Sequence, residues 1–451
     1  MSDDRTTLIL PVENQVRELD AKLLLACVAA ERGFPVVLGS RALVHHRVSS
    51  IPRGVYLAKS LRRLSDKMFD ILDKLGHDIV AWDEEALVRL RDDNYYYGRR
   101  LSPKTLRLSS ALFAWGPENE AVFRGYPGYD GTPIYVTGNP RTDMMRPELC
   151  GYYAEDIEQI HKRYDRFILV NTNFGGDNHF LRAFRVDQPA GRPKNAFEAG
   201  LAARRTAQFQ SFQQMLPALS RSLPDHTILI RPHPTEDHEF WRALAKDLPN
   251  TRVAGDGNVV PWLMACEALI HVGCTTAVEA AVIGRPAIAY QGTLSETFDP
   301  PLPYALSHHA SSLDELLEKT RAAISGGLGV AGGEDRRVLT RNITALDGHF
   351  ASERMLDALE GMGYAERRPE PPGAFRYAQG WIENQARTAR KRINMRRRGH
   401  RNSTEYHDHR YPGVTLEGMR ARVARLRDAL GRFHGIRIRQ LFEHIFRVTS
   451  D

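Results

Sequence analysis

The chain has 451 residues, more than one hydrophobic core usually holds, so two domains are expected. Apolar residues make up 42% of the chain and charged residues 26%, which excludes general disorder. No run of about 18 apolar residues occurs and the acidic start MSDDRTT differs from a secretory signal, so we expect a cytoplasmic protein. The four cysteines have no metal-ligand spacing and predict buried, reduced thiols; they are Cys27, Cys150, Cys266 and Cys274.

The positive charge is concentrated in the last part of the chain. Residues 363–451 hold 20 Lys and Arg against nine Asp and Glu, an excess of 11, whereas the whole chain carries +7. The preceding part is therefore slightly acidic, since 7 − 11 = −4. The charge pattern lacks interleaved aromatic residues for base stacking and argues against a nucleic-acid partner.

Apolar runs and helical periodicity alternate along residues 1–150. Predicted strands lie at 7–12, 34–38, 54–57, 78–82, 111–115 and 133–137. After the first strand, Asn14 is a candidate N-cap, and apolar residues recur at helical spacing from Val16 until Gly33 ends the helix. This alternation predicts a parallel sheet with helices on both faces, in an N-terminal Rossmann-like domain.

The alternation restarts in the second part of the chain. Predicted strands lie at 166–170, 226–230, 268–271 and 286–290, with a short strand near 251 and helices near 196–219, 237, 259 and 276–284. Residues 151–365 are therefore expected to form a second Rossmann-like domain. Two doubly wound α/β domains facing each other across a cleft constitute the GT-B architecture.

Residues 366–451 are expected to form a linker and a basic helical extension. The run PEPPG at 369–373 indicates the linker, and 415–433 has the pattern of an amphipathic basic helix. We expect this helix to pack back onto the domains. The basic cluster at 390–398 is expected to face solvent or an anionic membrane surface.

Asp83, Glu84 and Glu85 directly follow a predicted strand. Ligands of open parallel sheets bind beyond the carboxyl ends of the strands, so these carboxylates are candidates for proton transfer. Mutual repulsion is expected to raise the pKa of at least one of them. The alternative is a solvated helix N-terminus, where the helix dipole favours acidic residues.

The segment Arg231-Pro-His-Pro234 follows another predicted strand. A proline on either side of His233 stiffens the loop and directs the imidazole. An Arg and a His on such a loop are suited to meet a phosphate. The alternative is that His233 only satisfies a turn carbonyl.

A third candidate is the turn from strand to helix at 273–279. Gly273 begins the turn, and Thr275 and Thr276 provide hydroxyl donors beside the free N–H groups of a helix N-terminus, which together form an anion site. Thr276 and Glu279 also have the spacing of a capping box, which is a structural explanation compatible with the first.

These segments resemble the bacterial surface carbohydrate biosynthesis proteins over nearly the whole chain. The resemblance rests on ENQVRELD (13–20), GHDIVAWDEE (76–85) and GNPRTD (138–143). A more distant resemblance is to bacterial sialyltransferases and capsule Kdo transferases, which carry an acidic pair followed by Gly, a His-Pro pair and a Ser/Thr pair. The counterparts here are Glu84-Glu85, His233-Pro234 and Thr275-Thr276. Ala86 replaces the Gly, which a backbone outside the left-handed region accommodates.

The resemblance implies an inverting glycosyltransferase that uses a CMP-activated acidic sugar and needs no cofactor. Glu85 would be the base, while His233, Arg231 and the Thr275/Thr276 turn would hold the nucleotide phosphate on the donor side, with Glu279 at the ribose. Arg17 and Lys22 would meet an anionic acceptor, or form the solvated face of their helix. The acceptor would be a glycan or a lipid-linked group at the inner face of the membrane, as in capsule or lipopolysaccharide assembly. The chain lacks an Asp-x-Asp motif, which argues against a metal that clamps a diphosphate.

Two other activities fit the same expected fold. A CDP-glycerol-type glycerophosphotransferase would use a similar His-Pro loop but move a phosphoglycerol. A UDP-sugar 2-epimerase would convert its nucleotide sugar without an acceptor. Product analysis distinguishes the three.

Overall fold

The computed structural model describes residues 5–188, 191–292, 294–331, 336–396 and 403–451. The chain divides into two compact units. Unit 1 comprises Met1–Ala86, Asp93–Tyr152 and Leu339–Asp451, and unit 2 comprises Leu87–Asp92 and Tyr153–Val338. Within the described ranges, no helix combines the length and the apolar character needed to cross a bilayer.

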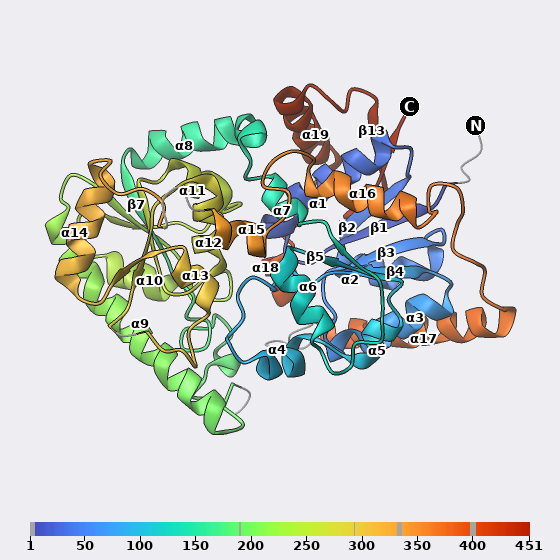
Figure 1. Cartoon of the computed structure of the whole chain (residues 1–451), viewed down its shortest axis with the longest axis horizontal. Helices are drawn as coiled ribbons and strands as arrows, with labels where there is room; N and C mark the ends of the chain where they lie inside the picture. The colour runs from blue at the N-terminus through green and yellow to red at the C-terminus, as the bar shows by residue number, and fades with distance from the viewer. Residues whose placement is uncertain (1–4, 189–190, 293, 332–335, 397–402) are drawn as a thin grey trace. The chain divides into compact units, whose positions relative to one another are not determined.

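Unit 1 contains an eight-stranded sheet (Figure 1). Its strands are β1 (Thr7–Val12), β2 (Val36–Ser40), β3 (Gly54–Ala58), β4 (Asp78–Ala81), β5 (Ala111–Ala114), β6 (Ile134–Val136), β13 (Ile436–Phe442) and β14 (Ile445–Ser450). The spatial order is β13-β14-β2-β1-β3-β4-β5-β6, and the strands from β2 to β6 pair in parallel. Strand β2 lies on one side of β1 and the following strand β3 on the other, so the strand order reverses at β1. The carboxyl ends of β1 and β3 therefore form the switch point where ligands bind such sheets.

The helices of unit 1 cover both faces of this sheet. They are α1 (Gln15–Glu31), α2 (Arg41–Arg47), α3 (Asp66–Lys74), α4 (Asp93–Arg100), α5 (Pro103–Arg107), α6 (Pro117–Arg124), α7 (Pro140–Asp143), α16 (Ala351–Gly361), α17 (Ala374–Met395), α18 (Thr404–Arg410) and α19 (Leu416–Leu430). Helix α1 contacts α7, α16 and α19, whereas α17 contacts α2 and α3. The helix expected at 415–433 therefore packs within unit 1, with Met419 and Leu426 buried.

Helix α1 begins where the sequence indicates but is capped differently. Asn14 is the N-cap residue, yet its side chain makes no capping hydrogen bond. The carboxylate of Glu18 instead accepts the backbone N–H groups of Glu13 and Asn14, at 3.0 and 3.1 Å. After the helix, Gly33 adopts a φ of +86°, a conformation that glycine tolerates best.

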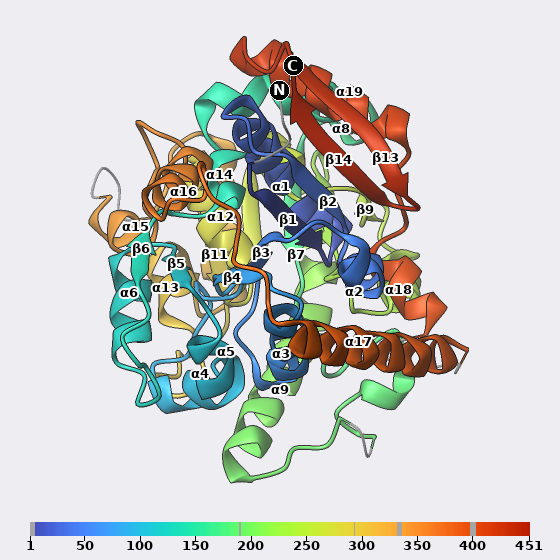
Figure 2. The ribbon, with the colours of Figure 1, turned by 90° about the vertical axis from the view of Figure 1, so that its right-hand side faces the viewer.

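The last two strands extend the sheet of unit 1 at its β2 edge (Figure 2). Strand β14 pairs antiparallel with β2, and β13 pairs antiparallel with β14. At this contact Gly39 leaves room for the backbone: a Cβ there would lie 2.3 Å from the carbonyl oxygen of His444. The chain end thus completes the edge of the N-terminal sheet.

Unit 2 contains a six-stranded, all-parallel sheet. Its strands are β7 (Phe167–Asn171), β8 (Thr227–Arg231), β9 (Thr251–Val253), β10 (Ala268–His271), β11 (Ala287–Tyr290) and β12 (His308–Ala310). The order β12-β11-β10-β7-β8-β9 is that of dinucleotide-binding α/β sheets. Its switch point lies between the carboxyl ends of β7 and β10.

Helices surround this second sheet as well. They are α8 (Ala154–Tyr164), α9 (Ala196–Ser222), α10 (His238–Ala245), α11 (Val260–Ala265), α12 (Thr275–Ile283), α13 (Pro301–Ala305) and α14 (Leu313–Ile324), and α15 (Arg337–Asn342) leads back into unit 1. A buried core includes Ile168, Ile230 and Ile270 from the three central strands, together with Phe212 and Trp241 from helices.

The chain divides differently from the expected domains 1–150, 151–365 and 366–451. The first boundary lies at Tyr152, close to the expected one, but the chain returns to unit 1 at Leu339. The expected extension is not an appendage, because 436–450 supplies two strands to the sheet of unit 1 rather than only helices. Of the cysteines, Cys150 is exposed rather than buried, and Cys27, Cys266 and Cys274 are buried as expected.

The close approach of β14 to Gly39 can be tested by stability. We expect Gly39→Ala to lower the free energy of unfolding of the full chain by about 1–3 kcal/mol, because the new methyl group displaces β14. Gly98→Ala is the matched control: it lies in α4 with open space around it, and should raise stability by about 0.5–1 kcal/mol. Urea unfolding measures both; equal stability of Gly39→Ala and wild type would contradict this packing.

Candidate functional site

The three carboxylates after β4 have different surroundings. Asp83 is fully buried and accepts hydrogen bonds from the Tyr96 hydroxyl, at 2.7 Å, and from the Arg100 Nε, at 2.9 Å. Glu84 is also buried and accepts the indole N–H of Trp82 at 2.5 Å. Only the Glu85 side chain is accessible, with 39% of its surface exposed. Asp83 and Glu84 therefore support the turn, and Glu85 is the carboxylate that can meet a ligand.

Glu85 is surrounded by cationic groups. Partial desolvation of the carboxyl acts to raise its pKa, but Arg17, Arg141, Lys59 and Arg100 outweigh this effect and lower the pKa to about 2. The contact with Arg17 is direct, with 3.3 Å between Arg17 Nη1 and Glu85 Oε1. The expected rise of a pKa by repulsion among the three carboxylates is therefore wrong for Glu85, because positive charges dominate around it.

The backbone conformation of Ala86 explains why this position, which is Gly in the resembled enzymes, can hold an alanine. Ala86 is not among the residues with positive φ, and its side chain is buried. An alanine therefore fits at this position without strain, as expected.

A buried charge network occupies the switch point of unit 1. Glu18 pairs with Lys22, at 2.8 Å, and with Lys59, which also lies 3.1 Å from Glu13. Burial acts to raise the pKa of Glu18, yet Lys22, Lys59 and the N–H of Glu13 hold it well below its usual value. Glu13 also contacts Arg41 at 3.0 Å, and its pKa is likewise lowered. Sequence reasoning did not select Glu13, Glu18 or Lys59, although Lys59 lies only two residues after the predicted strand 54–57.

The structure separates the two cations expected at an acceptor. Arg17 contacts Glu85 and remains partly exposed, with 25% of its side chain accessible. Lys22 is only 3% exposed and donates to the carbonyl oxygen of Pro11 at 2.6 Å as well as to Glu18. Lys22 is thus neither an acceptor contact nor part of a solvated helix face, because the buried Glu18 needs a counter-charge.

The C-terminal extension reaches this end of the sheet. Arg410 of α18 donates to Glu13 at 2.6 Å, and a nitrogen of His407 lies 3.1 Å from the Ser40 hydroxyl at the end of β2. The Gln15 side chain makes two hydrogen bonds of 2.8 Å with the backbone of Gly413. The extension therefore covers the carboxyl ends of β1 and β2.

The turn GNPRTD supports the acidic turn from the other side. Asn139 caps α7 by accepting the N–H of Arg141, at 3.0 Å. The Arg141 guanidinium lies 3.7 Å from Glu84 and over the Trp115 ring. Asp143 accepts the N–H groups of Ala351 and Ser352 at the start of α16. The motif thus connects 76–86 with the part of unit 1 that follows residue 339.

In unit 2, the loop after β8 orients His233. Its Nδ1 accepts the backbone N–H of Thr235 at 3.2 Å and lies 2.8 Å from the Thr235 hydroxyl. Nδ1 is therefore the acceptor nitrogen, so a neutral ring carries its proton on Nε2. The His233 N–H donates to Glu236, which also accepts from the Trp241 indole at 2.9 Å. These contacts give a partly exposed imidazole whose Nε2–H is a donor.

Arg231 makes structural contacts within unit 2 that the sequence did not indicate. Its two terminal nitrogens donate to the carbonyl oxygens of Asp256 and Gly257, at 3.0 and 2.6 Å, and its guanidinium lies over the Trp262 ring. Burial lowers its pKa to about 10. Arg231 therefore holds the loop after β9, and its contact with a phosphate stays a prediction, as does a role for Pro234.

The helix that follows β10 begins two residues earlier than a capping box of Thr276 and Glu279 requires. Cys274 is the N-cap of α12, and its side chain makes no capping hydrogen bond, although its Sγ lies 2.6 Å from the Thr276 hydroxyl. Gly273 has a φ of +56°, and Thr275 and Thr276, both partly exposed, form the first turn. Glu279 is buried in the second turn, so the capping-box explanation of Thr276 and Glu279 is wrong. The first turn retains the geometry of an anion site beside the switch point.

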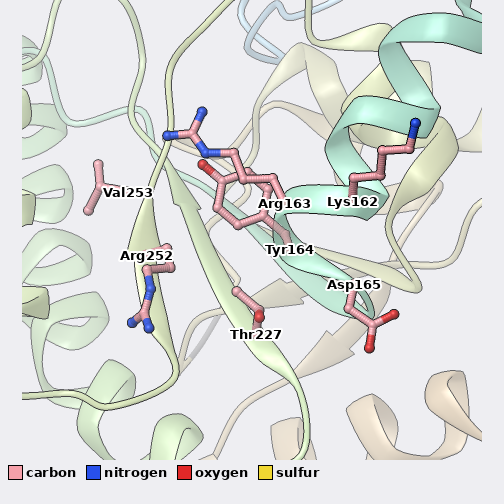
Figure 3. A pocket seen from close by; sticks show the side chains of 7 residues that line it. All are labelled: Lys162, Arg163, Tyr164, Asp165, Thr227, Arg252 and Val253. Carbon is pink, nitrogen blue, oxygen red and sulfur yellow. The ribbon is translucent and has the colours of Figure 1, made fainter.

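A surface depression of about 540 Å³ lies on unit 2, at the end of its sheet opposite to the His233 loop (Figure 3). It is lined by Lys162, Arg163, Tyr164, Asp165, Thr227, Arg252 and Val253. Thr227 begins β8 and Asp165 precedes β7, whereas the His233 loop follows the end of β8. The depression is therefore at the amino-terminal ends of the strands, away from the candidate site.

Comparison with known proteins identifies the fold. No protein-family model and no curated protein matches the sequence. The structure is similar to that of the wall teichoic acid polymerase TagF, with a TM-score of 0.50 and 11% identity over 79% of this chain and 89% of that chain. It is also similar to a putative UDP-N-acetylglucosamine 2-epimerase from Listeria monocytogenes, with a TM-score of 0.51 and 13% identity over 82% of this chain and 99% of that chain. At these identities the likeness concerns the fold, and it confirms the predicted two-domain α/β class.

The buried network at the switch point can be tested by removing its shared cation. We expect Lys59→Met to lower the free energy of unfolding at neutral pH by about 3–5 kcal/mol, because Glu13 and Glu18 lose their common counter-charge. The folded-state pKa of Glu18 lies below 4.5, so its stabilising contribution is present above that pH and is lost as the pH falls. The difference between variant and wild type should therefore shrink as the pH falls below 4.5.

The control is Lys104→Met, which removes a partly exposed lysine paired with Asp70 at 3.2 Å. This change should cost less than about 1 kcal/mol. Equal effects of the two substitutions in denaturant titrations would contradict a special role of Lys59.

Proposed function

We propose that this protein is an inverting glycosyltransferase that transfers a sugar from a nucleotide donor to an acceptor in the assembly of a surface glycan. The observation that carries the proposal is the placement of two complementary groups at ligand-binding edges of the two sheets. In unit 1 an accessible, ionised carboxylate, Glu85, follows β4. In unit 2 the Nε2–H of His233 follows β8 and the first turn of α12 follows β10.

The groups in unit 2 are suited to one phosphate. The N–H groups of Thr275 and Thr276 belong to an uncapped first turn, and the imidazole Nε2–H is a further donor. Arg231 is held by loop carbonyls, so the donors of this set are the neutral N–H groups and the imidazole. The donor set thus supports a leaving nucleoside monophosphate, and by resemblance a CMP-activated acidic sugar, with Glu279 at the ribose.

The groups in unit 1 are suited to an acceptor with a hydroxyl and a negative charge. At neutral pH the carboxylate of Glu85 is ionised and its partner Arg17 is partly exposed. An acidic acceptor that pairs with Arg17 would weaken the interaction that lowers the pKa of Glu85. Acceptor binding would thereby shift Glu85 toward the range of an effective base.

The reaction then follows from these roles. The acceptor oxygen attacks the anomeric carbon and its proton passes to the Glu85 carboxylate. The bond between that carbon and the phosphate oxygen breaks, and the electron pair leaves with the nucleotide phosphate. His233 Nε2–H and the α12 amides stabilise the charge that develops on the phosphate. The anomeric centre is inverted, and no metal or cofactor takes part in this scheme.

The setting of the reaction is part of the proposal. Nucleotide sugars are cytoplasmic substrates, and a lipid-linked acceptor would lie at the inner face of the cytoplasmic membrane. The fold similarity to an enzyme that makes wall teichoic acid is consistent with such a setting.

Single substitutions test the two proposed roles. We expect Glu85→Gln to lower kcat by about 10²–10⁴-fold, because the variant cannot accept the proton. His233→Ala should lower kcat by about 10²–10³-fold, because one donor to the leaving phosphate is lost. Release of free CMP from candidate CMP-sugars in the presence of acceptor measures both.

The matched controls are Glu370→Gln in unit 1 and His161→Ala in unit 2. Both residues are exposed, so these variants should retain the wild-type rate. Wild-type turnover in Glu85→Gln or in His233→Ala would remove the role proposed for that residue. Circular dichroism and thermal unfolding confirm that each variant is folded.

The nucleotide can be identified before the sugar is known. Among CMP, CDP, UDP and GDP we expect CMP to raise the Tm of the wild-type chain most, since binding at about 100 times Kd stabilises by about 2.7 kcal/mol. The shift should be reduced in Thr275→Val and Thr276→Val. A dominant response to UDP would favour the epimerase alternative.

Phosphoglycerol transfer from CDP-glycerol would also release CMP. Mass analysis of the acceptor therefore decides between these two activities. A gain of a glycosyl residue supports the proposal, and a gain of a phosphoglycerol unit replaces it.

A further inference from the structure

Helix α17 of unit 1 has its apolar side on the outside. Of the eight large hydrophobic side chains that are exposed among the described residues, five lie on this helix. They are Phe375, Tyr377, Trp381, Ile382 and Ile393. Surface helices ordinarily turn their apolar stripe toward the core, so this concentration needs an explanation.

The exposed residues form a continuous stripe along the helix. Positions 375, 378, 382, 386, 389 and 393 are Phe, Ala, Ile, Ala, Ala and Ile, and all six are exposed. Their spacing of three and four residues places them on one helix face. Phe375 is 86% exposed, and Ile382 and Ile393 are 59% and 62% exposed. We call this surface the α17 stripe.

The opposite face of α17 is polar and attaches the helix to unit 1. Gly380, Asn384 and Thr388 are its buried positions. Glu383 pairs with Lys74 of α3 at 3.0 Å and with Lys67 at 2.8 Å. Figure 2 shows the first part of α17 next to α3. The helix is therefore fixed by ion pairs and small side chains, which leaves the α17 stripe facing outward.

Positive charge accompanies the stripe. Helix α17 contains Arg376, Arg387, Arg390, Lys391 and Arg392 against the single acid Glu383, a difference of +4. Four of these cations lie in its last nine residues, and Arg396 follows directly. On the inner side, burial together with Arg387 and Arg41 lowers the pKa of Lys391 to about 8, which shows that positive charge is also crowded there.

The geometry points to α17 as an amphipathic helix that lies in the interface of an anionic phospholipid bilayer, with the α17 stripe inserted among the acyl chains. Aliphatic and aromatic side chains flanked by Arg and Lys are the composition of helices that bind this way. Trp381, 47% exposed beside the stripe, is suited to the headgroup level. Anionic lipid headgroups would supply negative charge to pair with the Arg and Lys side chains at the C-terminal end of α17.

A second copy of the chain fits this face less well. A symmetric pair would bring two helices of charge +4 together, and like charges would repel across the contact. The membrane inference depends only on the surface of α17 and needs no substrate. Its failure would therefore leave the proposed transferase chemistry untouched.

Vesicle co-sedimentation of the full chain tests the inference. We expect binding to mixed phosphatidylcholine–phosphatidylglycerol vesicles and weak binding to pure phosphatidylcholine. The triple change Phe375→Ser, Ile382→Ser and Ile393→Ser should lower the partition coefficient at least about tenfold, because it removes most of the inserted apolar surface. Arg390→Gln with Arg392→Gln should weaken binding to the anionic vesicles and reduce its salt dependence.

Leu64→Ser is the matched control, because Leu64 is 73% exposed in unit 1 but lies outside α17. This variant should bind as the wild type does. Brominated lipids should quench wild-type tryptophan fluorescence more than that of Trp381→Phe. The triple variant should keep the wild-type Tm, since all three side chains are exposed.

Three outcomes would overturn the inference. They are failure of the wild type to bind anionic vesicles, undiminished binding by the triple variant, and a wild-type dimer that the triple variant converts to a monomer without any vesicle binding. The last result would assign the α17 stripe to contact between copies of the chain.

Discussion

The candidate site of unit 1 depends on the compensation of buried charge at the switch point of its sheet. Glu18 is nearly inaccessible, and such a carboxylate stays ionised only where cations and N–H groups surround it. Lys22, Lys59 and the start of α1 supply them. Because Lys59 is also among the cations that lower the pKa of Glu85, the network that stabilises the strand ends contributes to the charge state of the accessible carboxylate.

Two segments remote in sequence complete this arrangement. The extension after residue 403 contributes Arg410 to Glu13, and the chain end adds two strands at the β2 edge. The GNPRTD turn connects the acidic turn to α16 through Arg141 and Asp143. The C-terminal part of the chain is thus a structural component of the N-terminal sheet, although its composition suggests a separate basic tail.

Unit 2 follows a simpler plan, in which loops after parallel strands present donors at the switch point. His233 is oriented by a hydrogen bond from the backbone of Thr235, and the first turn of α12 is uncapped. Arg231 is the most evident cation of this region in the sequence, but its guanidinium donates hydrogen bonds to the loop after β9. In the proposed function, these neutral donors would hold the single phosphate of the leaving nucleotide.

The sequence by itself determined the alternation of strands and helices, the fold class and the three strand-end turns, because periodicity and turn residues act locally. The Asp83–Glu85 run and the His233 loop could be selected from their positions after strands, and the resemblance selected Glu85 as the base. Only the tertiary structure decided that Lys22 is buried against Glu18, that arginines lower the pKa of Glu85, and that 339–451 belongs to unit 1. Each of these depends on contacts between residues far apart or on burial, and neither the spacing of residues nor their chemical type reports which charges the fold brings together.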